Sequence, residues 1–154
     1  MKTTILALAA TALVLLGCEN ESLEQQMTSA GNTELVKVVI DIPRIALKSK
    51  EEVVAVIGAP LECEETKHGE KCSFAPGETE IVFIDGKADW ITVSDMAAMP
   101  YSENSLAAIG LTVMPPSVLT TEPLAWNSID GLRAVSFFPS GKSIWYAYIR
   151  AKTE

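Results

Sequence analysis

Apolar and polar residues follow one another in blocks along this chain, and their spacing predicts the order of its elements. An apolar run at residues 5–16 comes first and is too short to cross a membrane as a permanent helix. A polar stretch without aromatic residues follows at 19–34 and is typical of a flexible tether, with a root-mean-square reach of about 20–25 Å. We therefore expect a leader at 1–17, a tether at 18–34 and a single folded domain at 35–154.

The clearest helix signal begins at Ser49. Ser49 and Glu52 have the spacing of a capping box, in which each side chain accepts a hydrogen bond from the backbone amide of the other residue. Apolar residues then recur at helical spacing, and a Gly-x-Pro sequence beginning at Gly58 supplies the stop. These signals predict a helix from Lys50 to Ile57.

Strands are expected on both sides of this helix. Residues 35–42 are rich in β-branched side chains and are predicted to form a strand. After the helix, 61–65 and 70–74 flank a four-residue loop that ends in Gly and predict a hairpin. Its register places Cys63 opposite Cys72, and counting from the loop makes them a hydrogen-bonded pair within disulfide reach. A disulfide there would stabilise the fold by about 2.5–3 kcal/mol on the chain-entropy model.

A second hairpin is predicted around Asp85-Gly86, a favoured type I′ turn pair between apolar runs at 80–84 and 87–94. With a two-residue loop, Phe83 would lie opposite Ala88, and Ile81 would lie opposite Trp90. Both faces of these strands are apolar. We expect them to be central strands that are covered on both sides, or that present one face to a partner.

A second helix-then-strands cycle follows. Ser102 is predicted to cap a helix that ends at Gly110, and strands are expected at 126–129, 132–138 and 143–150. The segments SKEEVVAVIG and SENSLAAIG are weakly similar, which fits a duplicated helix-plus-hairpin unit and fits chance equally well. The predicted fold class is α+β, with an antiparallel sheet packed against two short helices.

The apolar run ends in Leu15-Leu16-Gly17-Cys18, with Lys2 as the positive residue before it. This pattern resembles a bacterial lipoprotein signal peptide. The resemblance implies cleavage before Cys18 and palmitate-type acylation of its sulfur and its new amino group. An ordinary secretory signal or a short anchor fits less well, because the chain turns polar directly after Cys18. Attachment through more than one acyl chain is durable, so the lipid would hold the protein at a membrane.

The resemblance also implies a location in the cell envelope. In Gram-negative lipoproteins, an Asp after the lipidated cysteine favours retention in the inner membrane, and this chain has Glu19 there. We therefore expect the outer membrane, facing the periplasm, rather than the inner membrane. Cys63 and Cys72 remain as a pair in an oxidising compartment, where a disulfide is the expected state.

The net charge of the chain limits the classes of molecule that it is expected to bind. The chain carries 20 Asp and Glu against 12 Lys and Arg, a formal net charge of −8, and loses one more positive charge if Lys2 is removed. Such a charge repels nucleic acid and anionic lipid surfaces. We expect a protein partner in the envelope and no nucleic acid.

Candidate catalytic and metal-binding groups are few. His68 is the only histidine and precedes Gly69 at a hairpin tip, which argues against a Ser-His-Asp triad and against multi-histidine zinc sites. Glu62, Glu64, Glu65 and Glu70 cluster on the first hairpin without a calcium-loop pattern. Asp89 lies within an apolar strand and is the carboxylate most worth examining for burial. We expect no catalytic residue, no metal and no cofactor, so the chain is predicted not to be an enzyme.

The C-terminal hairpin is aromatic. Strand alternation would send Tyr146 and Tyr148 to one face and Trp145 to the other. One set is expected in the core. The other is a candidate contact surface, because aromatic side chains commonly anchor protein interfaces.

The segment from Ser49 to about Val93 resembles small outer-membrane lipoproteins of the SmpA/OmlA type and, more distantly, the β-lactamase-inhibitor-protein-like fold. The carrying residues are Ser49, Glu52, Val53, Ile57, Gly58, Pro60, Ile81 to Ile84 and Trp90 to Val93. The first family implies an accessory role in outer-membrane assembly, and the second implies inhibition through protein binding. This chain differs from the first family in carrying a second helix-and-hairpin cycle.

These observations predict a non-catalytic protein-binding or scaffold module that is anchored in the envelope. The alternatives are an inhibitor of a periplasmic hydrolase and, third, an enzyme that uses Asp89 or the Glu cluster.

Overall fold

The computed structural model describes residues 36–118 and 122–153. The chain divides into two units, Met1–Glu34 and Leu35–Glu154, and every element described below belongs to the second unit. The tether and Cys18 lie outside the described residues. Within the described part of the chain, no helix has the length and apolarity that a membrane span requires.

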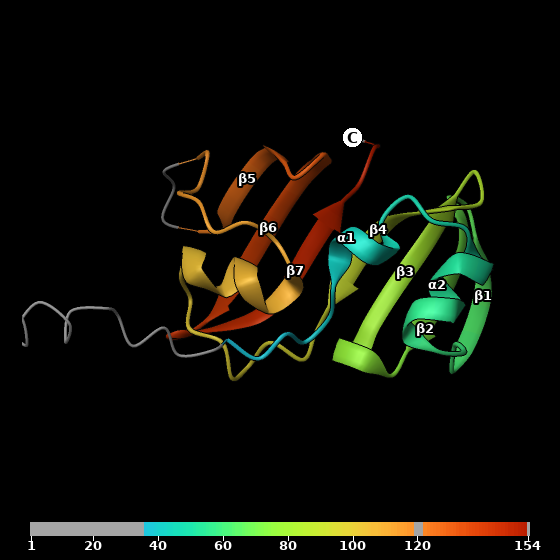
Figure 1. Cartoon of the computed structure of the whole chain (residues 1–154), viewed down its shortest axis with the longest axis horizontal. Helices are drawn as coiled ribbons and strands as arrows, with labels where there is room; N and C mark the ends of the chain where they lie inside the picture. Colours follow the sequence, from blue (N-terminus) through green and yellow to red (C-terminus); the bar gives the residue numbers. More distant parts are fainter. Residues whose placement is uncertain (1–35, 119–121, 154) are drawn as a thin grey trace, which may run out of the picture. The chain divides into compact units, whose positions relative to one another are not determined.

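One antiparallel sheet of seven strands organises the second unit, in the order β1-β2-β3-β4-β7-β6-β5 (Figure 1). The strands are β1 (Glu62–Thr66), β2 (Gly69–Phe74), β3 (Thr79–Ile84), β4 (Lys87–Val93), β5 (Leu124–Ile129), β6 (Leu132–Ser140) and β7 (Ser143–Arg150). The helices are α1 (Ile42–Ile45) and α2 (Lys50–Ile57), with 3-10 turns at η1 (Pro76–Glu78) and η2 (Glu103–Ile109). The mixed α+β class is therefore as predicted.

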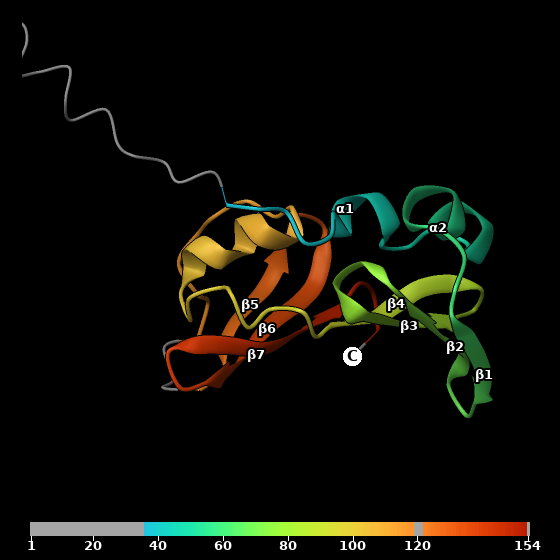
Figure 2. The same ribbon diagram turned by 90° about the horizontal axis from the view of Figure 1, so that it is seen from below.

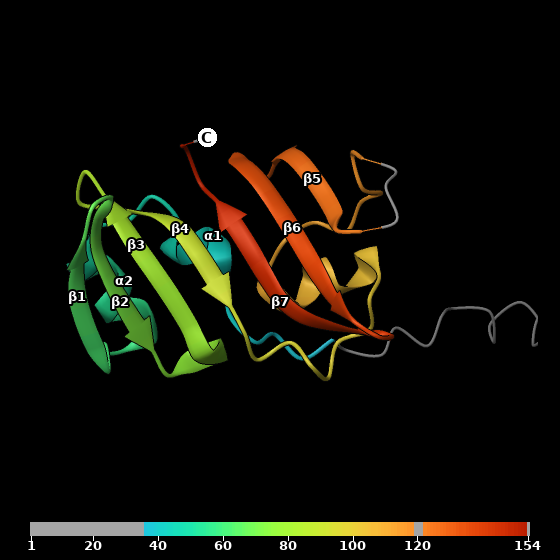
Figure 3. The same ribbon diagram turned by 180° about the vertical axis from the view of Figure 1, so that it is seen from behind.

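Helices α1, α2 and η2 all lie on one side of the sheet (Figure 2). The opposite side, seen in Figure 3 with the strands in front of the helices, is called the open face below. Residues paired across neighbouring strands share a face. Ile91 pairs with Ile149, and Val93 pairs with Ala147; all four are buried, so this row faces the helices and forms the core.

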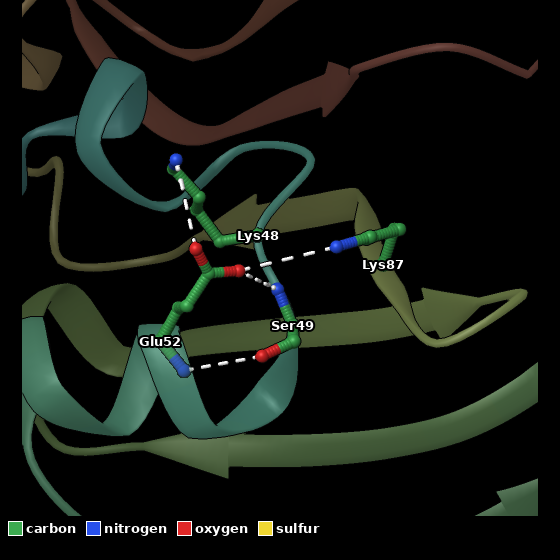
Figure 4. A network of polar contacts seen from close by, with 4 residues as sticks. All are labelled: Lys48, Ser49, Glu52 and Lys87. Atoms are coloured by element: carbon green, nitrogen blue, oxygen red, sulfur yellow. Dashed lines mark hydrogen bonds and ion pairs between the residues drawn. The ribbon is translucent and has the colours of Figure 1, made fainter.

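The capping box at the start of α2 is present as predicted. The Glu52 amide donates to Ser49 Oγ at 3.3 Å, and the Ser49 amide donates to Glu52 Oε2 at 2.8 Å (Figure 4). Lys48 Nζ and Lys87 Nζ lie 3.8 and 3.9 Å from the same carboxylate. Glu52 thereby connects the first turn of α2 to the β3–β4 hairpin through an exposed network.

The predicted strand at 35–42 is wrong for the residues described. Residues 36–41 form no strand, and α1 begins at Ile42 with Pro43 in its first turn. Proline suits that position because its fixed φ is helical and its missing N–H would be unpaired there in any case. Ile40 and Ile45 are buried all the same. Their apolar side chains pack in the core without the backbone joining the sheet. The β-branched composition of this segment therefore indicated burial and not a strand.

The second predicted helix is a 3-10 turn, η2, rather than an α-helix. Leu106 and Ile109 are buried, and Gly110 ends the turn with a left-handed φ of 75°, both as expected. The Ser102 side chain does not cap it. Instead, the buried Ser105 hydroxyl donates to the Pro100 carbonyl at 2.7 Å, a tie to the preceding loop.

The register of the second hairpin differs from its prediction by a β-bulge. Asp85 and Gly86 have φ of 51° and 72°, as a type I′ turn requires, and Phe83 pairs with Ala88 as expected. Beyond that pair the register shifts, so Ile81 lies opposite Ile91 rather than Trp90. Asp89 is the extra residue in β4. A bulge moves every later side chain to the other face, which sequence alternation alone cannot anticipate.

The first hairpin carries the predicted pairs Cys63–Cys72 and Glu65–Glu70, and a disulfide joins the two cysteines. Its loop is shorter than predicted, because Thr66 pairs with Gly69 across only two residues. That shift makes the cysteines a non-hydrogen-bonded pair, correcting the expectation above. Their Cα atoms are 4.1 Å apart, which fits the closer spacing of such pairs.

Candidate functional site

Three aromatic side chains gather on the open face where β6 and β7 meet. The Phe138 and Tyr146 rings stack with centroids 4.5 Å apart and planes 13° from parallel. Trp145 meets Tyr146 edge-on, with centroids 5.2 Å apart and planes at 76°. We call these three residues the aromatic cluster.

A second β-bulge places Trp145 there. Phe138 pairs with Tyr146, but the next pair joins Pro139 to Ile144, so Trp145 is an extra residue in β7. Ile144 takes the buried position, and Trp145 is 66% exposed. The prediction that Trp145 would lie on the face opposite Tyr146 is therefore wrong. The bulge removes one step of alternation and brings the two rings together.

Tyr148 continues the open face beside the cluster. It pairs with Ser136 on β6 and with Thr92 on β4. Its sequence neighbours Ala147 and Ile149 point to the other face of the sheet and are buried in the core. Partial burial raises the pKa of Tyr148, an effect that Asp89 adds to and Arg150 opposes. The hydroxyl therefore stays protonated near neutral pH and is a hydrogen-bond donor as well as an acceptor.

The aromatic cluster contains no ionisable side chain other than the phenol of Tyr146. Its rings offer apolar area, and with Tyr148 the surface adds one polar group. Trp and Tyr dominate the binding energy of many protein interfaces. No family model, curated protein or solved structure matches this chain.

The candidate carboxylate, Asp89, lies in the β4 bulge and is only 3% exposed. Its Oδ1 accepts from the Lys152 amide at 3.0 Å and from the Thr153 amide and hydroxyl at 3.2 Å each. The Thr153 hydroxyl also accepts from Trp90 Nε1 at 2.7 Å. Asp89 thus holds the C-terminal segment against β4.

A surface hollow of about 330 Å³ lies beside Asp89. It is lined by Leu47, Ile84, Asp85, Lys87, Asp89, Lys152 and Thr153. The Asp89 carboxylate beside this hollow already accepts hydrogen bonds from the backbone amides of the C-terminal segment.

The acidic residues of the first hairpin are divided between its two faces. Glu70 pairs with Lys50 of α2 at 2.6 Å, under the helices. Glu64 pairs with Lys71 at 2.7 Å on the open face. Among the described residues, only Glu70 with Cys63 and Cys72 brings three possible metal-ligand atoms together. Both sulfurs are joined in the disulfide, so neither is a free thiolate.

One contact on the open face was missed by sequence reasoning. His68, at the tip of the first hairpin, lies over Trp90 of β4 with ring centroids 4.6 Å apart. The two-residue loop and the β4 bulge together create this contact. A sequence signal for it would have required both registers to be known. Cys18, the predicted lipidation site, lies outside the described residues.

Proposed function

We propose that this chain is a lipid-anchored envelope protein that binds another protein through the aromatic cluster on its open face. The observation that carries the proposal is Trp145, which is two-thirds exposed and contacts the Tyr146 ring edge-on. A large aromatic side chain in water forgoes the stabilisation that burial would supply. Interface aromatics that are already ordered lose little conformational entropy on binding, which favours affinity.

No described helix covers the aromatic cluster. The Val39 amide donates to the Ala108 carbonyl at 2.7 Å, so the first described residues lie beside η2. They are on the helix-covered side of the sheet, opposite the open face that carries the cluster (Figure 2).

Binding should depend on Trp145 more than on its neighbours. Truncating a central interface aromatic typically costs about 2 kcal/mol or more, which is about thirtyfold in Kd. Trp145→Ala should leave folding intact, because most of the side chain is in water. The matched control is Leu61→Ala, which removes another apolar side chain, 72% exposed, just before β1 at the other end of the strand order.

The test uses the full chain, tagged at its C-terminus and expressed in its own cells, with detergent-extracted envelopes passed over wild-type and variant protein. We expect a discrete envelope protein that wild type retains and Trp145→Ala loses. The recovered protein is then purified and its Kd measured against each variant by calorimetry. Equal Kd values for wild type and Trp145→Ala would refute the proposed site.

The anchor has its own test. Intact-protein mass spectrometry of the membrane fraction should find acyl chains on Cys18, and Cys18→Ser should release the protein from the membrane. Unmodified Cys18 in the membrane fraction would refute the anchor while leaving the binding site to be judged separately.

The second function, inhibition of a periplasmic hydrolase, uses the same surface. A single preorganised aromatic surface suits a rigid complex with an enzyme as well as a scaffold contact. If the recovered partner is a hydrolase, adding equimolar protein should abolish its activity, and Trp145→Ala should restore it. If the hydrolase keeps full activity in the saturated complex, the protein is not its inhibitor, and the scaffold role remains.

The order of elements also supports the proposed duplication. In each half a helix or 3-10 turn is followed by strands that run from the sheet edge to its centre, ending in β4 and β7, which pair. The aromatic cluster belongs to the second half alone.

A further inference from the structure

The sheet has two edge strands, and within the described residues a neighbouring segment is hydrogen-bonded to only one of them, β5. At β5, the Ser117 and Val118 amides donate to the Ala125 carbonyl at 2.8 and 3.3 Å, and Ser117 Oγ accepts from the Asn127 amide at 3.1 Å. At β1, β2 alone is hydrogen-bonded to the strand's backbone among residues 36–118 and 122–153. The edge of β1 is therefore open.

The register of the hairpin identifies which backbone groups this edge presents. Thr66 and Gly69 close a two-residue loop and form a hydrogen-bonded pair. Bonding alternates along an antiparallel strand, so Glu64 is bonded to β2, while Cys63 and Glu65 direct N–H and C=O outward. The 4.1 Å Cα separation of the cysteines agrees with this assignment. β1 thus offers the donors and acceptors that an added strand uses.

The edge is also held in place. The Cys63–Cys72 disulfide fixes β1 to β2 at its middle, and Lys50 of α2 pairs with Glu70 on the next strand at 2.6 Å. An edge that is already ordered loses little entropy when another strand adds to it.

The negative charge of β1 determines which kind of segment can bind at its open edge. Glu62, Glu64 and Glu65 lie along β1, and of these only Glu64 has an ion pair within the described residues. A second copy of β1 would place glutamates against glutamates, and like charges directly opposite are destabilising. The chain's own segment at 19–34 carries four glutamates and no lysine or arginine, so it is disfavoured for the same reason.

We propose that β1 is a docking edge for a basic, extended segment of another protein, which adds to the sheet antiparallel to β1. Basic side chains would lie opposite Glu62, Glu64 and Glu65, with an apolar one opposite Cys63. This edge is separate from the aromatic cluster, so its test and that of the proposed function fail independently.

The test uses the full chain, labelled with 15N, in zwitterionic detergent micelles and titrated with the peptide Ac-TKKVKT-NH2. In the antiparallel register its second and fourth residues lie opposite Glu65 and Cys63 and donate their amides to β1. The expected result is saturable shifts of the Cys63 and Glu65 amides without shifts of β5 amides. No shift at those two amides would overturn the proposal.

Two matched controls separate strand addition from charge attraction alone. Methylating the second and fourth peptide amides should abolish binding, while methylating the third and fifth, which point away from β1, should not. Glu62→Gln with Glu65→Gln should weaken binding about three- to tenfold. Glu103→Gln, an exposed glutamate on η2, should leave it unchanged. Equal effects of the two methylated peptides, or equally tight binding of Ac-TEEVET-NH2, would also overturn the proposal.

Discussion

Replacing Asp89 tests whether the β4 bulge is held by the C-terminal segment. The carboxylate is 3% exposed and accepts from the Lys152 amide and from the Thr153 amide and hydroxyl, at 3.0 to 3.2 Å through Oδ1. Hydrogen bonds to a charged group contribute about 1.5–3 kcal/mol each. In Asp89→Ala the freed amides lie close to the chain end and can reach water, so the net loss is smaller than their sum.

We therefore expect Asp89→Ala to lower the free energy of unfolding by about 2–3 kcal/mol, and Asp89→Asn, which keeps one acceptor oxygen, by about 1–2 kcal/mol. With typical urea slopes, the first change moves the unfolding midpoint by about 1 M. Amide exchange at Lys152 and Thr153 should also accelerate in Asp89→Ala, because those amides lose their acceptor, and less in Asp89→Asn.

The control is Asp95→Ala, because Asp95 is an exposed carboxylate in the loop after β4. It should change stability by less than about 0.5 kcal/mol. If Asp89→Ala behaves like Asp95→Ala, with unchanged exchange at the chain end, then Asp89 does not anchor that segment.

Four further substitutions probe the local structure by urea unfolding. A Cβ at Gly69, where φ is 139°, would overlap the backbone carbonyl of Phe83, so Gly69→Ala should cost about 2 kcal/mol or more, whereas Gly86→Ala, with open space around it, should cost only about 1 kcal/mol. Ser49→Ala removes the α2 cap and should cost about 1 kcal/mol. The hydrogen bond from the Ser49 amide lowers the pKa of Glu52. Its folded pKa then lies below the unfolded one, so the stability that Glu52 contributes is present above the ordinary carboxyl range and is lost as pH falls through the folded pKa. Glu52→Gln should accordingly destabilise at neutral pH and match wild type in strong acid, and a constant difference across pH would contradict this.

Local signals explain which elements the sequence predicts well. Helix α2 has both of its ends specified within ten residues, by Ser49 and Gly58, and its bounds agree with the prediction. The type I′ turn at Asp85-Gly86 is specified by two residues with positive φ. The cysteine pair follows from hairpin register, which survived an error in loop length because both loops are symmetric about the same point.

The predictions that were wrong concern features that are set by tertiary packing rather than by local sequence. Residues 36–41 are rich in β-branched side chains, yet the segment packs beside η2 without joining the sheet. The bulges at Asp89 and Trp145 depend on neighbouring strands, so no single strand encodes them. The aromatic residues of the cluster were visible in the sequence, but their shared face was not, because one extra residue reverses the alternation on which that prediction depended.

The most direct test of the central proposal places a photoreactive benzoylphenylalanine at Tyr148, beside the aromatic cluster, in the full chain in its own cells, with the same residue at Glu103 on the helix-covered side as the control. We expect one discrete crosslinked protein from position 148 that is absent from position 103 and lost when Trp145 is changed to Ala. No crosslink at position 148, the same products from both positions, or a crosslink that survives Trp145→Ala would contradict the proposal.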